Sequence, residues 1–187
     1  MRMTVALAAL PLFALAACGS SEPAGDAPAD DAMTMDAAGD SAQNAVATLL
    51  DADGNEVGMV TATGSGGGVT IDLMVSGMEP GMRGVHVHET GACTPDFAAA
   101  GSHWNPETLT HGLEGDDGQH AGDMPNLEVG ADGTGTLSYM LAMGASFDGL
   151  LDGDGSAFVI HADEDDQVTD PSGNSGDRIA CGVFAAA

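Results

Sequence analysis

The chain has 187 residues, with 3 basic residues against 29 acidic ones and a formal net charge of −26. This balance excludes nucleic-acid binding, which needs a basic surface patch, and disfavours electrostatic attraction to anionic lipid. Hydrophobic residues make up 43% of the chain but aromatic residues only 4%, so aliphatic side chains and methionine must fill the core. The 28 glycines favour many turns, as in an all-β domain.

Residues 1–17 have the features of an export signal. Arg2 is followed by an apolar run, residues 5–17, which is too short to span a bilayer as a stable helix. The run ends in the motif LAAC, which resembles the lipobox of bacterial lipoproteins. This resemblance implies a lipid anchor at Cys18 and a periplasmic protein, and Gly19 in the next position favours the outer membrane. The alternative is an ordinary signal peptide with an unrelated cysteine.

Residues 18–44 are predicted to be the lipidated cysteine and a disordered acidic tether. The segment holds mainly Ala, Gly, Pro, Ser and Asp, and its carboxylates repel each other. As a flexible coil it would reach about 30 Å. Met33 and Met35 could offer thioether ligands to Cu(I), although two methionines in such a segment are more often part of its composition.

Residues 45–187 have the pattern of a single domain built from short strands. Eight runs of apolar or β-branched residues are expected to be strands: 45–50, 57–63, 69–75, 84–88, 127–129, 134–141, 157–161 and 178–184. Turn-forming residues separate the first three runs, so an antiparallel sandwich or barrel is predicted. The intervals 89–125 and 162–177 carry no strand pattern, and loops of this length are usually functional.

The six histidines are the most informative residues of the chain. His86 and His88 form a His-x-His pair on a predicted strand, where both imidazoles share one face about 7 Å apart. Counting this pair, five histidines and Asp123 fall within residues 86–123. Imidazole and carboxylate are ligands of zinc and copper, so this density favours a metal site. A Ser-His-Asp hydrolase needs only one histidine and explains the cluster poorly.

The motifs around these histidines resemble those of the copper/zinc superoxide dismutases, over residues 45–184. GVHVHE (84–89) is similar to the family's first copper motif, and GSHWNP (101–106) is similar to its bridging-histidine motif. The spacing from His103 to His111, His120 and Asp123 matches that of the family's zinc loop. The motif GNSGDRIACGV (173–183) resembles the family's C-terminal signature. The resemblance implies an eight-stranded Greek-key fold and the dismutation of superoxide to oxygen and hydrogen peroxide.

The resemblance also implies a role for every histidine. The implied copper ligands are His86, His88, His103 and His161. The implied zinc ligands are His103, His111, His120 and Asp123. His103 would bridge one redox-cycling copper ion to one structural zinc ion per subunit, and it would carry a proton to the product.

Other implied roles concern charge and cross-linking. Arg178 would lie beside copper and attract the superoxide anion. Asp165 would hydrogen-bond a ligand of each metal, although it could also be a solvated acid in an acidic loop. Cys93 and Cys181 occupy the positions that the family pairs in a disulfide, which an exported protein permits. The chain contains no lysine, whereas members of the family commonly steer the substrate with lysines.

The sequence leaves open two functions from other classes. One is a periplasmic copper-binding or storage module that binds the metal without turnover. The other is a structural relative that has lost its metals, which the complete ligand set disfavours. The sequence leaves open whether the protein is a monomer or a homodimer.

Overall fold

The computed structural model describes residues 42–115 and 118–187. The predicted export signal, the lipidation site at Cys18 and most of the predicted tether, with Met33 and Met35, lie outside these residues. Within the described ranges, no helix is long and apolar enough to cross a membrane.

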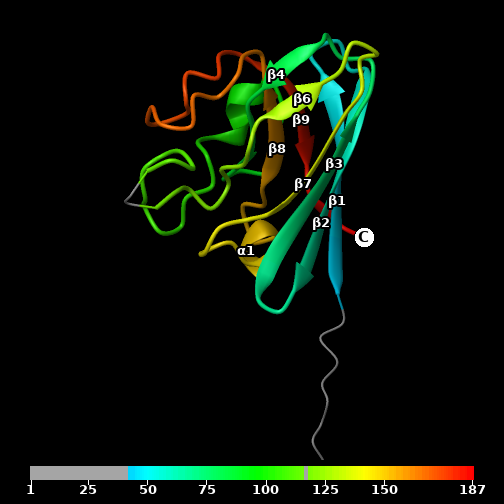
Figure 1. Ribbon diagram of the computed structural model, residues 1–187. Helices are drawn as coiled ribbons and strands as arrows, with labels where there is room; N and C mark the ends of the chain where they lie inside the picture. The colour runs from blue at the N-terminus through cyan, green and yellow to red at the C-terminus, as the bar shows by residue number, and fades with distance from the viewer. Residues whose placement is uncertain (1–41, 116–117) are drawn as a thin grey trace, which may run out of the picture. The chain divides into compact units, whose positions relative to one another are not determined.

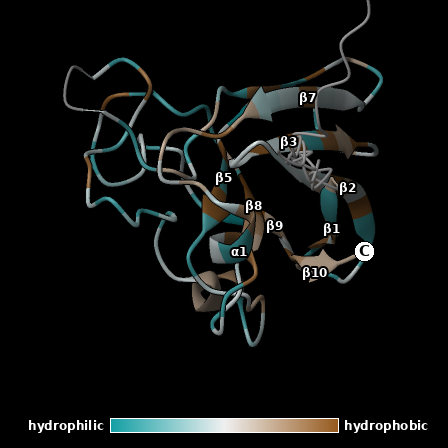
Figure 2. Ribbon diagram, turned by 90° about the horizontal axis from the view of Figure 1, so that it is seen from below, coloured by the Kyte–Doolittle hydropathy of each residue, from teal (hydrophilic) through white to brown (hydrophobic). Residues whose placement is uncertain are grey.

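One large antiparallel sheet dominates the described chain (Figure 1). Its strands are β1 (Gln43–Asp51), β2 (Glu56–Ser65), β3 (Gly68–Val75), β5 (Val85–His88), β7 (Gly135–Met140), β8 (Ala157–His161), β9 (Arg178–Val183) and β10 (Ala185–Ala186). The strand order is β5-β8-β9-β1-β2-β3-β7, and β10 pairs with β1. Seen end-on, the sheet curls around its core, which confirms the all-β prediction (Figure 2).

Alternation along the strands builds this core. In β1, Ala45, Ala47 and Leu49 are buried, whereas Asn44 and Thr48 face outward and are exposed. The neighbouring strands β2 and β3 repeat this pattern with Val60, Ile71 and Leu73 among their buried residues. Each strand therefore places one apolar face on the core, as the two-residue period requires.

Tight turns set the register of the first three strands. The Asp51 side chain accepts hydrogen bonds from the backbone N–H groups of Asp53 (2.9 Å) and Asn55 (2.8 Å). Gly54 follows with a φ of 83°, a conformation that favours glycine. In the second turn, Gly66 and Gly67 have φ values of 60° and 85°. The residues that signalled hairpins in the sequence therefore form the turns between β1, β2 and β3.

Two short strands and two short helical segments were not predicted. β4 (Gly81–Arg83) pairs with β6 (Leu127–Val129) in a separate two-stranded sheet, and β10 extends β1. The helical segments are η1 (Phe97–Ala100) and α1 (Phe147–Leu150). None of these four elements exceeds four residues, so none is long enough to show a hydrophobic period.

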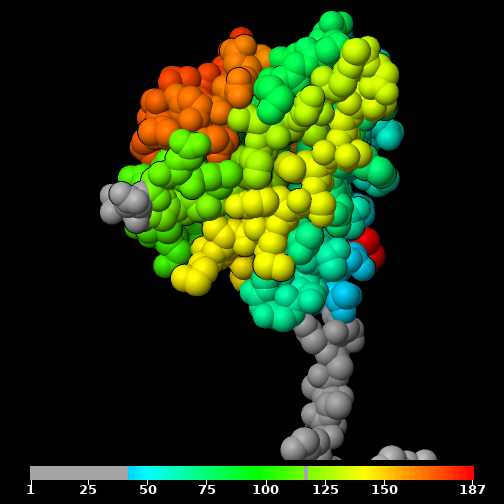
Figure 3. All heavy atoms as spheres, viewed as in Figure 1, coloured from blue at the N-terminus to red at the C-terminus, as the bar shows by residue number. Residues whose placement is uncertain are grey.

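The two long loops lie side by side on one flank of the domain, where the green and orange surfaces meet (Figure 3). A hydrogen bond joins the two loops, since the backbone N–H of His111 donates to the side-chain Oδ1 of Asp170 over 2.9 Å. The disulfide between Cys93 and Cys181 fastens the first loop to β9, with a Cα–Cα distance of 5.8 Å. The sheet thus supplies a rigid base, and the loops cover the histidines that lie on it.

Candidate metal centre

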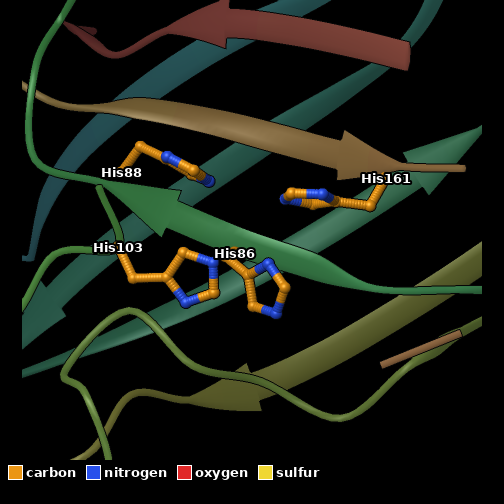
Figure 4. Close-up of side chains that lie close together, drawn as sticks. All are labelled: His86, His88, His103 and His161. Carbon is orange, nitrogen blue, oxygen red and sulfur yellow. The ribbon is translucent and has the colours of Figure 1, made fainter. Parts of the chain in front are cut away.

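The strands and loops bring all six histidines together in the interior. His86 and His88 lie on β5, and His161 ends the neighbouring strand β8. His103 comes from the first long loop and forms an isolated β-bridge with His88. The two β5 histidines lie under the loops rather than in solvent, so both are fully buried. The four side chains approach one another in one small region (Figure 4).

Four imidazoles form the first group, called here the four-histidine group: His86, His88, His103 and His161. One ligand atom from each residue lies within 4.8 Å of the others. Within this group, the buried nitrogens without a hydrogen-bond partner are His86 Nδ1 and the Nε2 atoms of His88, His103 and His161. Buried polar atoms without partners are rare, and a set of converging imidazole nitrogens suits copper or zinc. The residues present therefore fit a bound metal ion.

The opposite nitrogens of three of these rings are held in place. His86 Nε2 lies 2.6 Å from Asp165 Oδ2. His88 Nδ1 donates to the carbonyl of Gly101 over 3.0 Å, and His161 Nδ1 donates to that of Gly176 over 3.2 Å. A carbonyl can only accept, so these contacts fix the tautomer and leave each Nε2 of His88 and His161 unprotonated. Partners of this kind also fix the ring orientation.

The second group consists of three histidines around one buried carboxylate: His103, His111, His120 and Asp123. The Nδ1 atoms lie 2.8, 3.1 and 3.3 Å, respectively, from the carboxylate oxygens of Asp123. Backbone N–H groups of Gly112 (2.9 Å) and His120 (3.1 Å) also donate to Asp123 Oδ2. Three imidazole nitrogens and one carboxylate form a donor set suited to tetrahedral zinc.

His103 belongs to both groups. Its Nδ1 faces Asp123, and its Nε2 is the unpartnered nitrogen in the four-histidine group. Its ring also stacks on that of His86, with centroids 3.9 Å apart. One imidazole therefore connects the two groups through its two nitrogens.

Asp165 makes a second connection between the groups. Its Oδ2 contacts His86, and its Oδ1 lies 3.1 Å from His111 Nε2. Asp165 is itself held by Asn126, whose side chain donates to the Asp165 carbonyl and accepts from its N–H, both over 2.8 Å. The geometry matches the expected link through Asp165 and adds Asn126 as the residue that positions it.

Two contributors were missed at the sequence level. Asn126 lies three residues after Asp123, and nothing in its type or spacing indicated a pairing with the second loop. Asp170 lies in an acidic stretch, where its contacts with the backbone of His111 and, at 3.7 Å, with His120 Nε2 could not be foreseen. Both act across two loops that are distant in sequence.

Burial controls the charge of the four-histidine group. It lowers the pKa of His86 to about 3 and that of His161 to about 4, so both rings are neutral at neutral pH. Burial also opposes charge on His111, but hydrogen bonds to Asp123 and Asp165 outweigh it and raise its pKa to about 9. For Asp123, burial is likewise outweighed, and hydrogen bonds from the histidines lower its pKa.

Arg178 lies at the edge of the four-histidine group, beside His161 in the pairing of β8 and β9. Its guanidinium donates to the carbonyls of Phe97 (2.7 Å) and Gly101 (2.6 Å). The Gly101 carbonyl also accepts from His88, so one backbone oxygen separates Arg178 from that ring. Burial lowers the pKa of Arg178, which nevertheless remains a cation because a guanidinium is protonated at any physiological pH.

Comparison with known proteins gives a consistent result. Residues 56–184 match the family model of copper/zinc superoxide dismutase. The chain is 41% identical to a Cu-Zn superoxide dismutase of Caulobacter vibrioides, over 75% of this chain and 85% of that protein. It is 39% identical to one of Deinococcus radiodurans, over 82% and 91% of the two chains.

A further relative and one solved structure come from Bacillus subtilis. The superoxide dismutase-like protein YojM is 42% identical, over 73% of both chains. The crystal structure of a SOD-like protein from this organism superposes with a TM-score of 0.67 and 40% identity, covering 75% of this chain and 97% of that one.

Proposed function

Because this chain belongs to the copper/zinc superoxide dismutase family and is itself a superoxide dismutase, we propose that its two histidine groups hold the two metals. The four-histidine group would bind copper, and the group around Asp123 would bind zinc. The observation that supports this assignment is the set of unpartnered buried nitrogens that face one another in the four-histidine group. The carboxylate occurs only in the second group, which suits the harder zinc ion.

Copper bound in the four-histidine group would supply the one-electron chemistry, by alternating between Cu(II) and Cu(I). The reaction, 2 O₂•⁻ + 2 H⁺ → O₂ + H₂O₂, also consumes protons, and the protein must deliver them. His103 Nε2 can hold a proton because it is unpartnered and faces the group, while Nδ1 stays directed at Asp123. We assign to His103 the transfer of one proton to the peroxide product.

Arg178 would attract and orient the anionic substrate. The described ranges hold two arginines and no lysine, and the other arginine, Arg83, donates to the carbonyls of Glu79 and Ala162 away from this group. The guanidinium of Arg178 donates hydrogen bonds to two carbonyls. These bonds hold the side chain in place, so its positive charge stays beside the four-histidine group. This preorganised charge favours binding of a small anion.

A second candidate function is copper binding or storage without turnover. It is favoured by the same ligand set, and one relative carries the name superoxide dismutase-like. The two functions differ in one measurable respect: an enzyme must turn over. Decay of superoxide should be measured on the purified chain loaded with both metals. The proposed function requires many turnovers per copper ion, whereas a storage module would give none beyond the copper present.

We also propose that the protein is exported and anchored in a bacterial membrane through lipidated Cys18, with the acidic segment as a tether. The LAAC motif at the end of the apolar run supports this. In the Cys18→Ser variant the protein should move from the membrane fraction to the soluble fraction. If the variant stays in the membrane fraction, the anchor is not at Cys18.

A further inference from the structure

A groove of about 780 Å³ lies outside the metal centre, beside the Cys93–Cys181 disulfide. It is formed by the end of β1, the segment before and within η1, and the start of β9; β1 and β9 can be followed in Figure 1. Its apolar lining includes Leu50, Pro95 and Phe97. Leu50 lies opposite Cys181 in the strand pairing and is 41% exposed. An apolar side chain from another molecule could therefore be buried here.

Three carboxylates surround this apolar lining: Asp51, Asp96 and Asp177. Asp96 and Asp177 are exposed. A hydrogen bond from the Asn55 side chain lowers the pKa of Asp51, which keeps this carboxylate charged at neutral pH. The one cation in the lining, Arg178, already donates to two backbone carbonyls. The groove thus combines an apolar floor with a negatively charged rim.

We propose that this groove binds a segment of another protein in which an apolar side chain is flanked by lysine or arginine. The apolar side chain would cover Leu50 and Phe97, and the flanking cations would meet the carboxylates of the rim. The net charge of −26 would also attract a basic partner from a distance.

A second copy of this chain does not meet these requirements. The sequence contains no lysine and only three arginines. Of the two arginines in the described ranges, Arg83 donates to backbone carbonyls and so does Arg178. Two copies would also repel each other through their acidic surfaces. The charge of the rim therefore points to a different, basic partner.

The groove shares two residues, Gly176 and Phe97, with the backbone that borders the metal centre. Gly176 lines the groove, and its carbonyl accepts the hydrogen bond of His161. Phe97 also lines it, and its carbonyl accepts from Arg178. A bound segment would touch the backbone that orients a proposed copper ligand and the proposed substrate cation.

The test uses the metal-loaded full-length chain and a fluorescent peptide, Gly-Lys-Lys-Leu-Phe-Lys-Lys-Gly, with binding followed by fluorescence anisotropy. The variant Asp51→Asn/Asp96→Asn/Asp177→Asn keeps the side-chain acceptors but removes the rim charge. A matched control, Asp72→Asn/Glu128→Gln/Asp148→Asn, removes the same charge from exposed positions outside the groove. We expect the rim variant to bind at least about fivefold more weakly and the control to stay within about twofold of wild type.

The apolar part of the site is tested separately. Leu50→Ser should weaken binding of this peptide by a similar factor, whereas Met74→Ser, at a side chain 58% exposed on β3, should not. Equal weakening by the rim variant and its control would mean general charge attraction and would overturn the proposal, as would undetectable binding. A dimer of the free chain that Leu50→Ser dissociates would show that a second copy occupies the groove, which also overturns it.

Discussion

His103 has the most demanding position in the metal centre, because its two nitrogens face different groups. Nδ1 lies 2.8 Å from Asp123, and Nε2 has no partner inside the four-histidine group. His161, by contrast, belongs to the four-histidine group alone, and its Nδ1 is held by the Gly176 carbonyl. A substitution at His161 should therefore disturb the proposed copper site alone, whereas a substitution at His103 should disturb both proposed metal sites.

Replacement of His161 by alanine should remove copper while leaving zinc in place. Its Nε2 is one of the four converging nitrogens, and the residue is absent from the group around Asp123. We expect His161→Ala to lose essentially all turnover and most of its copper, with zinc close to one ion per chain. Metal analysis of the purified variant checks this, with His120→Ala as the matched control that should lose zinc first. Loss of zinc from His161→Ala would show that the two assignments are wrong.

At the level of residues, spacing within the sequence was sufficient to select the histidines and Asp123. The motif resemblance also selected Asp165, which contacts His86 and His111 as expected. What could not be predicted is how these residues are held. Asn126 and the carbonyls of Gly101 and Gly176 act through contacts between segments that are distant in sequence. Every residue has a backbone carbonyl, so the sequence does not indicate which carbonyls accept these hydrogen bonds.

At the level of elements, the disulfide joins the first long loop to the last long strand of the main sheet. The two cysteines are 88 residues apart, so the bond closes a long loop in the unfolded chain. In the folded chain, Phe97 lies shortly after Cys93, and its carbonyl holds Arg178. The disulfide therefore restricts the conformations of the unfolded chain. In the folded chain, it also restricts movement of the segment whose Phe97 carbonyl accepts the hydrogen bond from Arg178.

The Cys93→Ser/Cys181→Ser variant should be less stable by about 2–4 kcal/mol, because closure of a long loop restricts the unfolded chain. Denaturant unfolding of the metal-loaded protein measures this loss. We also expect reduced turnover at full copper occupancy, since the segment that anchors Arg178 is released. The change Ser65→Ala, at the end of β2 and away from the disulfide, serves as the control. A variant with wild-type stability would contradict this role of the disulfide.

The long strands were predictable because each has enough residues to show alternation, as in β1 and β2. The short strand β4 has only three residues, and β10 has two, so their pairing with β6 and β1 depends on the finished fold. β1 also begins at Gln43, and Asn44 pairs with Thr63. Polar residues can occupy this strand end because both Gln43 and Asn44 are exposed there.

At the level of the whole molecule, the metal-free protein should be most stable near pH 6.5. The folded pKa values of His86 (about 3) and His161 (about 4) lie below the ordinary value of 6.5. As the pH falls below 6.5, the unfolded chain binds protons that these buried rings cannot, so stability decreases. The pKa of His111 is raised to about 9, so its stabilising charge is complete below 6.5 and is lost as the pH rises through 9.

Urea unfolding of the chelator-treated protein measures this dependence. We expect lower free energies of unfolding at about pH 5 and about pH 9 than at about pH 6.5. The His111→Gln variant is the control for the alkaline side, where its stability should change less with pH. A free energy of unfolding that is constant from about pH 5 to about pH 9 would contradict the prediction.

Salt should not slow the enzyme. The net charge of −26 repels superoxide at long range, and the chain has no lysine to steer it. The Debye length falls from about 30 Å at 0.01 M salt to about 8 Å at 0.15 M, so added salt screens the distant carboxylates before it screens Arg178 and the metals. The second-order rate constant should therefore be flat or rise over this range. A steep fall would mean that a local positive field outweighs the global charge.

In the proposed mechanism, His103 serves both metal groups and carries a proton to the product. The most direct test is the second-order rate constant of superoxide decay per bound copper ion for His103→Gln, compared with the wild-type chain. Loss of a positioned proton donor typically costs a factor of about 100 or more, and we expect a decrease of this size together with weaker binding of both metals. A rate constant within about twofold of wild type, with both metals fully bound, would contradict this role of His103.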